Sequence, residues 1–261
     1  MPGGAGKKGR SMSDLSAGAG ERLAHARRAN LLVPPLTSEE APDVAAAYAV
    51  QRAAIAAWGL DPAGWKIGAS SADVQTRLGL AHAFYGPLFA PDCHPDGSAI
   101  VRPAGLRGLE VELAFRLGRD LPAGKTYTVE EVADAAAGLY LALEVVATRQ
   151  EGALKGLAAI ADFGLNHAFV HGPAVEGWRE LDLAAVHAAF LIDDRQRAEG
   201  DASVVLGSPL LALTWLANAG PGLRAGQWIS TGALTGLQPT PDACTVTGDF
   251  GQLGRVTAQL V

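Results

Sequence analysis

Two glutamates stand two residues apart in the segment LEVELAFRL, residues 109–117. The strict alternation of apolar residues in this segment predicts a β-strand. On a strand, Glu110 and Glu112 project from the same face, with their backbones roughly 7 Å apart. Two carboxylates this close repel each other, and a cation bound between them relieves the repulsion. Hard divalent cations such as Mg²⁺ prefer carboxylate oxygens and leave coordination positions open for a chelating substrate.

Glu144 supplies a third carboxylate from the otherwise apolar segment LYLALEVVAT, residues 139–148. This composition predicts a central strand that is covered on both faces. Burying an unpaired carboxylate is costly, so a partner is expected, and a metal ion shared with Glu110 and Glu112 would satisfy all three groups. The alternative for the first two glutamates is a solvated strand face, which is the usual setting of such a pair.

Helices and strands of mixed order indicate an α+β fold in one strand-rich domain, residues 21–261, preceded by a disordered leader over residues 1–20. Capping signals place a helix between Thr37 or Ser38 and Ala57, and two more begin after Ser71 and Ser208. Further helices are predicted over 21–30 and 129–137. Alternating or apolar segments bounded by glycine predict strands over 64–70, 109–117 and 139–148, and again beyond residue 187.

The composition is that of a globular protein, with 49% apolar and 18% charged residues. A net charge of −6 argues against a nucleic-acid partner, which requires a basic surface. No apolar run is expected to reach the roughly 20 residues of a membrane span, and the N-terminus lacks the apolar stretch of a secretory signal. Cys93 and Cys244 match no metal or redox spacing and are predicted to be free thiols. We therefore expect a cytoplasmic protein without a membrane partner.

Several motifs recur in the order known from one protein family. They are GWKIGASSADVQTRLGL, YGPLF, LEVELAF, LALEVVATR, IADFGLN, GSPLLALTWLAN and LRAGQWISTGALTG. From about residue 21 to residue 261, the chain resembles the group of 2-keto-4-pentenoate hydratases and 4-oxalocrotonate decarboxylases, which are relatives of fumarylacetoacetate hydrolase. The resemblance implies the fold of the fumarylacetoacetate hydrolase C-terminal region with added N-terminal helices, and a homo-oligomer. It also implies that Glu110, Glu112 and Glu144 bind Mg²⁺ or Mn²⁺, and that Lys66 lies near the substrate.

The implied substrate is a small 2-oxo or 2-hydroxy-dienoic acid that chelates the metal, which stabilises an enolate or dienolate. Lys66 is the predicted catalytic residue: it would pair with the substrate carboxylate, or move a proton if burial lowers its pKa. The backbone at Thr231 and Gly232 is expected to offer N–H groups to that carboxylate. Arg149 has two interpretations, a contact with the substrate carboxylate or a structural ion pair.

The chain departs from the family pattern at several positions near the expected site. Phe84, beside Tyr85 in the predicted substrate pocket, replaces an aspartate that is a candidate base for water addition. Ala147 and Ala233 replace an acidic residue and a serine, and ADFGL at 161–165 replaces a more polar segment. A hydratase-like lyase is the first prediction. A 2-oxo acid decarboxylase or tautomerase is the alternative, and a non-catalytic binding or partner subunit is the alternative from another class.

Overall fold

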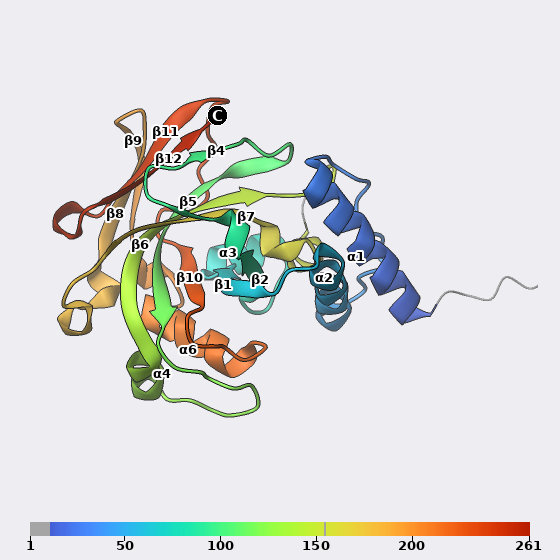
Figure 1. Ribbon diagram of the computed structural model, residues 1–261, viewed down its shortest axis with the longest axis horizontal. Coiled ribbons are helices and arrows are strands. Elements are labelled where there is room, and N and C mark those ends of the chain that lie inside the picture. The colour runs from blue at the N-terminus through green and yellow to red at the C-terminus, as the bar shows by residue number, and fades with distance from the viewer. Residues whose placement is uncertain (1–10, 154) are drawn as a thin grey trace, which may run out of the picture.

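The computed structural model describes residues 11–153 and 155–261, which form helices around two β-sheets (Figure 1). The helices are α1 (Met12–Ala29), α2 (Val44–Trp58), α3 (Ala72–Leu78), α4 (Val129–Ala135), α5 (Gly156–Ala161) and α6 (Pro209–Ala219), with short 3₁₀ turns that include η2 (Phe163–Leu165) and η5 (Ala202–Val204). The first strands are β1 (Pro62–Gly68), β2 (Phe84–Phe89), β3 (Cys93–Pro95), β4 (Ala99–Ile100), β5 (Leu106–Leu117) and β6 (Ala136–Ala147). The later strands are β7 (Asn166–Ala174), β8 (His187–Ile192), β9 (Arg195–Asp201), β10 (Trp228–Ala233), β11 (Cys244–Asp249) and β12 (Arg255–Leu260).

Seven strands form one sheet in the order β2-β1-β10-β5-β6-β7-β3, and five form a second sheet in the order β4-β12-β11-β8-β9. One face of β5 carries Leu109, Val111, Leu113 and Phe115, all fully buried in the main core that also receives the second sheet and α6. The helices, strands and strand-rich core confirm the predicted α+β fold.

The other face of β5 turns toward the inside of a curled sheet. Along that face stand, in order, Glu110, Glu112, Ala114 and Arg116, as the two-residue period of a strand requires. The sheet curls until Leu88 of β2 meets Phe169 of β7, and together with Ala114 and Ala142 these residues form a small, fully buried cluster. The inner face is thereby divided into one end with the glutamates and another end with Arg116.

Helix boundaries follow the capping residues closely in two cases. Ser71 and Ser208 cap α3 and α6, as predicted, through bonds from the backbone N–H groups of Val74 and Leu210. Helix α2 begins later than predicted, because Asp43 accepts from Ala46 and so provides its cap. Thr37 instead forms a tight turn with Glu40, whose carboxylate also pairs with Arg22.

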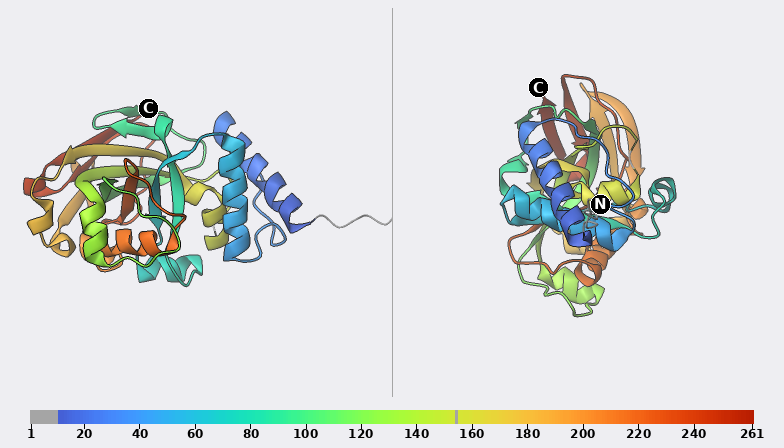
Figure 2. Two further views of the ribbon diagram at one scale, coloured as in Figure 1. Left: turned by 60° about the horizontal axis from the view of Figure 1, so that its bottom comes forward. Right: turned by 90° about the vertical axis from the view of Figure 1, so that its right-hand side faces the viewer.

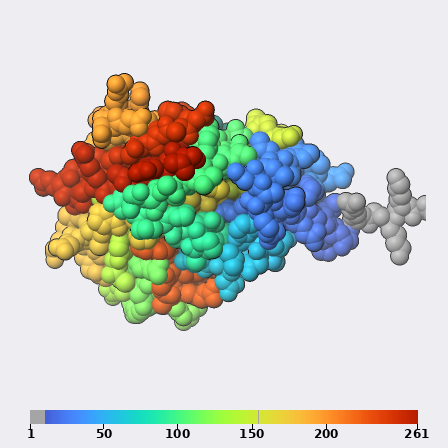
Figure 3. All heavy atoms as spheres, turned by 45° about the horizontal axis from the view of Figure 1, so that its top comes forward, coloured from blue at the N-terminus to red at the C-terminus, as the bar shows by residue number. Residues whose placement is uncertain are grey.

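The first helix begins well before residue 21, so the predicted leader is wrong for residues 11–20. Ser11 and Asp14 form a capping box, and the helix runs without interruption from Met12. Helices α1 and α2 lie side by side at one end of the molecule (Figures 2 and 3). In the N-terminal half of α1, the small residues Ala19 and Gly20 are buried. Small residues carry little hydrophobic signal in a sequence, so the pattern of residues 11–20 does not indicate a packed helix. The rest of the predicted leader, residues 1–10, lies outside the described residues.

Two glycines of α1 provide a test of this packing. An alanine Cβ at Gly20 would lie 2.6 Å from the Ala53 Cβ on α2, whereas nothing lies within 4 Å of a Cβ at Gly18. Gly20→Ala is expected to lower the free energy of unfolding by about 1–3 kcal/mol through overpacking. Gly18→Ala is expected to raise it by about 0.5–1 kcal/mol through helix propensity alone. Urea denaturation measures both, and equal small effects would mean that this half of α1 does not pack on α2.

One stretch, Ala202–Ala219, is long and apolar enough by composition alone to span a membrane. It is divided into η5 and the 11-residue helix α6, whose length of roughly 17 Å falls short of the ~30 Å hydrocarbon layer. Leu213 and Leu216 of α6 are fully buried in the main core. The apolar character of this stretch therefore belongs to core packing.

Candidate metal centre

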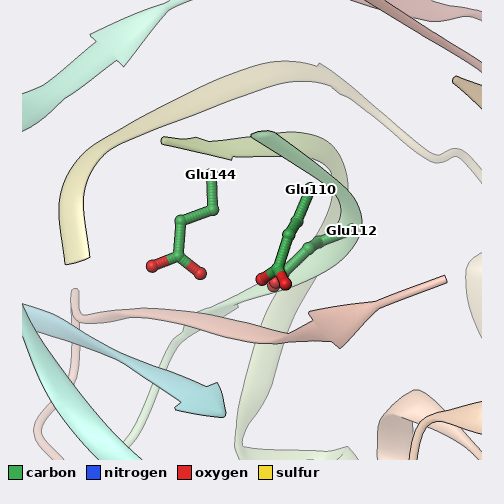
Figure 4. A group of neighbouring side chains, drawn as sticks. All are labelled: Glu110, Glu112 and Glu144. Carbon is green, nitrogen blue, oxygen red and sulfur yellow. The ribbon is translucent and has the colours of Figure 1, made fainter. Parts of the chain in front are cut away.

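Three carboxylates converge at one end of the curled sheet, as Figure 4 shows. Glu110 and Glu144 face each other as a cross-strand pair of β5 and β6, and Glu112 lies two residues further along β5. One oxygen from each of the three lies within 4.8 Å of the others. Glu112 and Glu144 are fully buried, so burial of Glu144 is as expected and the alternative of a solvated face for Glu110 and Glu112 does not hold for Glu112.

Glu112 is held by strand β10. Its Oε2 accepts hydrogen bonds from the Ser230 hydroxyl at 2.5 Å and from the Gly232 N–H at 2.9 Å. A shift in the β10–β5 register between Ser230 and Ala233 directs the Gly232 N–H inward. The other oxygen, Oε1, is buried and has no hydrogen-bond partner within the described part of the chain. Burial, and then the charges of Glu144 and Glu110, raise the pKa of Glu112 well above its usual range.

Glu144 lies between an amide and an ammonium group. Its Oε1 accepts from the Asn166 side-chain amide at 3.1 Å, and its Oε2 lies 3.1 Å from the Lys66 Nζ. Burial raises the pKa of Glu144 to about 7, even though Lys66 opposes the shift. The site therefore holds its negative charge at an electrostatic cost, which a bound cation would offset.

Lys66 is a buried member of the site and not a surface lysine. Only 3% of its surface is exposed, and it reaches the carboxylates from β1. Burial alone would lower its pKa, but the three glutamates outweigh burial and the pKa is raised. The expectation that burial lowers this pKa is therefore corrected for the protein without its metal: the acidic neighbours keep the ammonium charged.

The donor set fits a hard divalent cation. Three carboxylates are the oxygen ligands that Mg²⁺ and Mn²⁺ favour, and the unpartnered Glu112 Oε1 is a buried acceptor of the kind that a metal ion satisfies. Ser230, Gly232 and Asn166 orient the carboxylates through bonds to the other oxygens, as outer-shell groups of metal sites do.

Phe84 forms an apolar wall beside Lys66. Its ring centre lies 5.9 Å from the Lys66 Nζ, and it covers Gly68, where a Cβ would lie 2.4 Å from the ring. Tyr85, its neighbour on the strand, points to the opposite face and packs against Tyr48 and Trp65. The placement of Tyr85 in the substrate pocket is therefore corrected, because alternate residues of β2 face opposite sides.

Three other predicted substrate contacts have different partners. Arg149 forms the structural ion pair: its guanidinium and backbone N–H bind Asp162, and both groups are buried. The Gly232 N–H binds Glu112, and the Thr231 hydroxyl binds the Leu113 carbonyl. Gly232 is still needed there, since its φ of 122° and the Ser70 side chain exclude a Cβ. The Arg149 side chain and the Gly232 N–H are therefore engaged within the protein, whereas the contact predicted for the Thr231 N–H stays a prediction.

Two side chains of the site escaped the sequence analysis, Asn166 and Ser230. Both lie inside quoted motifs, Asn166 at the end of IADFGLN and Ser230 in LRAGQWISTGALTG. The spacing of Ser230 and Gly232 could have indicated Ser230, because residues two apart on a strand lie on the same face. Asn166 follows a 3₁₀ turn whose course no periodicity indicates.

Asn166 is itself fixed by two buried arginines. Its carbonyl accepts from Arg149 Nη1 at 2.9 Å and from Arg27 Nη1. Arg27 belongs to α1, so a contact chain of Arg27, Asn166 and Glu144 links the N-terminal helix to the glutamates. Burial, and then the charge of Arg149, lower the pKa of Arg27 to about 10.

The sequence profile of the fumarylacetoacetate (FAA) hydrolase C-terminal family matches residues 84–260. The chain belongs to this family, which confirms the resemblance and the predicted fold. A 2-keto-4-pentenoate hydratase from Paraburkholderia phymatum is 33% identical over 91% of this chain and 94% of its own length. The named relatives are enzymes, and the chain is an enzyme.

Two solved structures are similar. The 4-oxalocrotonate decarboxylase of Pseudomonas putida G7, complexed with magnesium and adipate, is 23% identical, with a TM-score of 0.86 over 98% of this chain and 100% of its own. Fumarylpyruvate hydrolase of Pseudomonas aeruginosa, in complex with Mn²⁺ and pyruvate, is 16% identical, with a TM-score of 0.59 over 76% of this chain and 88% of its own. The ions in these two structures are divalent.

Proposed function

We propose that the protein is a metal-dependent lyase of the hydratase type, acting on a small 2-oxo or 2-hydroxy-dienoic acid. One observation carries the proposal: three buried or half-buried carboxylates converge beside a charged, buried lysine, and the buried Glu112 Oε1 has no partner among the described residues. Such a set holds a divalent cation and leaves room for a chelating substrate. The hydratase relative, similar over nearly the whole chain, supports the choice of reaction.

Glu110, Glu112 and Glu144 would hold Mg²⁺ or Mn²⁺, which supplies Lewis-acid stabilisation of an enolate or dienolate. Lys66 supplies a fixed positive charge next to Glu144, in position to bind the carboxylate of an anionic substrate. Ser230, Gly232 and Asn166 keep the carboxylates in place, so that little reorganisation is needed when charge develops. Phe84 excludes water from one side of Lys66.

Decarboxylation is the second candidate, favoured by the apolar groups around the site. Phe84 stands beside Lys66, and Ala147 and Phe163 are buried where the family pattern has polar residues. Loss of CO₂ from a 2-oxo acid needs electron withdrawal but no positioned base for water.

We also propose that the protein is a homo-oligomer and that it is cytoplasmic. Light scattering of the purified protein tests the oligomeric state.

The test is a substrate panel with the purified full chain. We expect turnover of 2-hydroxy-dienoic acids with Mg²⁺ or Mn²⁺, and its loss with a chelator. Ultraviolet absorbance measures the loss of the diene by hydration. A coupled assay measures the release of CO₂ by decarboxylation. Metal-dependent release of CO₂ would favour the second candidate. Metal binding with no turnover of any panel member would favour a non-catalytic binding protein and contradict the proposal.

A further inference from the structure

The end of the curled sheet opposite the glutamates opens into a second cavity, of about 550 Å³. It is lined by Arg116 of β5, Trp228 of β10, His171 of β7, Cys93 of β3 and Arg224 of the loop before β10. A volume in this range is typical of small-molecule sites. The cavity is separate from the metal centre, because the fully buried side chains of Leu88, Ala114, Ala142 and Phe169 lie between the two ends.

Trp228 organises the cavity. The Arg116 guanidinium lies 4.6 Å from its ring centre, and the His171 ring stacks on it at 4.8 Å with an interplanar angle of 16°. Tyr140 contacts the same ring edge-on, at 4.8 Å. These contacts fix the half-buried guanidinium in one place, as a preorganised binding group requires.

Of the residues that the structure describes, two arginines and no acidic side chain line this cavity. Within the described residues, no side chain forms an ion pair or hydrogen bond with the Arg116 guanidinium, which contacts the Trp228 ring instead. The nearby carboxylate of Asp96 accepts from the backbone and hydroxyl of Thr257, and that of Asp120 accepts from the Ala225 N–H. Arg224 adds a second positive charge at the rim. This concentration of positive charge occurs in a chain whose net charge is −6.

We propose that this cavity is a second binding site, for a small organic anion whose carboxylate binds Arg116 and Arg224. An arginine side chain presents N–H groups in the fork geometry that a carboxylate accepts. The volume exceeds what an inorganic ion needs, which favours an organic anion. The inference does not depend on the proposed function, because the cavity shares no side chain with the metal centre.

The probe is succinate, titrated into the full chain in the presence of a chelator, with tryptophan fluorescence and calorimetry as the readouts. We expect a saturable change in both, while Trp228→Phe loses most of the optical change and retains calorimetric binding. Arg116→Gln is expected to weaken succinate binding at least about tenfold. Arg224→Gln is expected to weaken it by a smaller factor. Arg119→Gln is the matched control, since Arg119 is exposed on the same segment and does not line the cavity.

Several outcomes would overturn the site. Unchanged affinity in both Arg116→Gln and Arg224→Gln, with native circular dichroism, would exclude it. An equal response to sodium chloride at matched ionic strength would mean charge screening only. Tighter binding of inorganic phosphate than of succinate would overturn the assignment to an organic anion. Glu112→Gln should leave succinate affinity unchanged, and this result separates the site from the metal centre.

Discussion

Glu112→Gln is expected to lower kcat/KM by about 10³-fold or more and to weaken Mg²⁺ or Mn²⁺ binding. The cause is that two groups, the Ser230 hydroxyl and the Gly232 N–H, donate hydrogen bonds to the Glu112 Oε2. A glutamine must turn its carbonyl oxygen toward these donors, which places its NH₂ group where the unpartnered Oε1 stands. A donor then faces the cation, and several kcal/mol of Lewis-acid stabilisation are lost. Steady-state kinetics and metal titration measure the two effects.

The same variant separates a metal site from a merely structural cluster. Removing one of three converging charges relieves repulsion, so the metal-free Glu112→Gln protein should melt at the same temperature as the wild type or higher. The rise in melting temperature caused by the metal should disappear at the same time. Ser230→Ala is the graded control, with an expected loss of about 10-fold to 100-fold in metal affinity. If Glu112→Gln instead unfolds the metal-free protein, the glutamates serve stability and the assignment is wrong.

The sequence predicted the parts of the site that follow from strand periodicity. Glu110 and Glu112 share a face because they lie two residues apart, and an apolar strand around Glu144 indicates burial whatever the fold. The cross-strand pairing of Glu110 with Glu144 depends on sheet register, which these segments do not encode individually. The resemblance to a family implied that the three glutamates bind one metal ion, but not this register.

Hydrogen-bond directions were the part that could not be predicted. The Gly232 N–H was expected to bind a substrate, but a local shift in register turns it toward Glu112. A turn and a short helix separate Arg149 from Asp162 in the chain, so sequence periodicity does not predict that the two residues pair. The first half of α1 was missed for another reason: its contacts with α2 use alanine and glycine, whose apolar signal is weak.

Arg27→Met is expected to lower the free energy of unfolding by about 3–5 kcal/mol. The guanidinium is buried, pairs with Asp92 at 2.7 Å, and donates to the carbonyls of Asn166 and His167. Methionine preserves apolar contact with Phe163 but removes a donor from the Asp92 carboxylate and from the His167 carbonyl, and leaves the Asn166 carbonyl with Arg149. Urea denaturation measures the loss, with circular dichroism to confirm that the variant folds.

Arg28→Met is the matched control for this prediction. Arg28 is the next residue of α1, is exposed, and donates to the carbonyls of Ala57 and Trp58, so its replacement should cost less than about 1 kcal/mol. A second readout tests the link to the metal centre. Because Arg27 holds Asn166 and Asn166 holds Glu144, Arg27→Met should also weaken metal binding by about tenfold, whereas Arg28→Met should not. Loss of stability with unchanged metal affinity would mean that α1 supports the fold but not the glutamates.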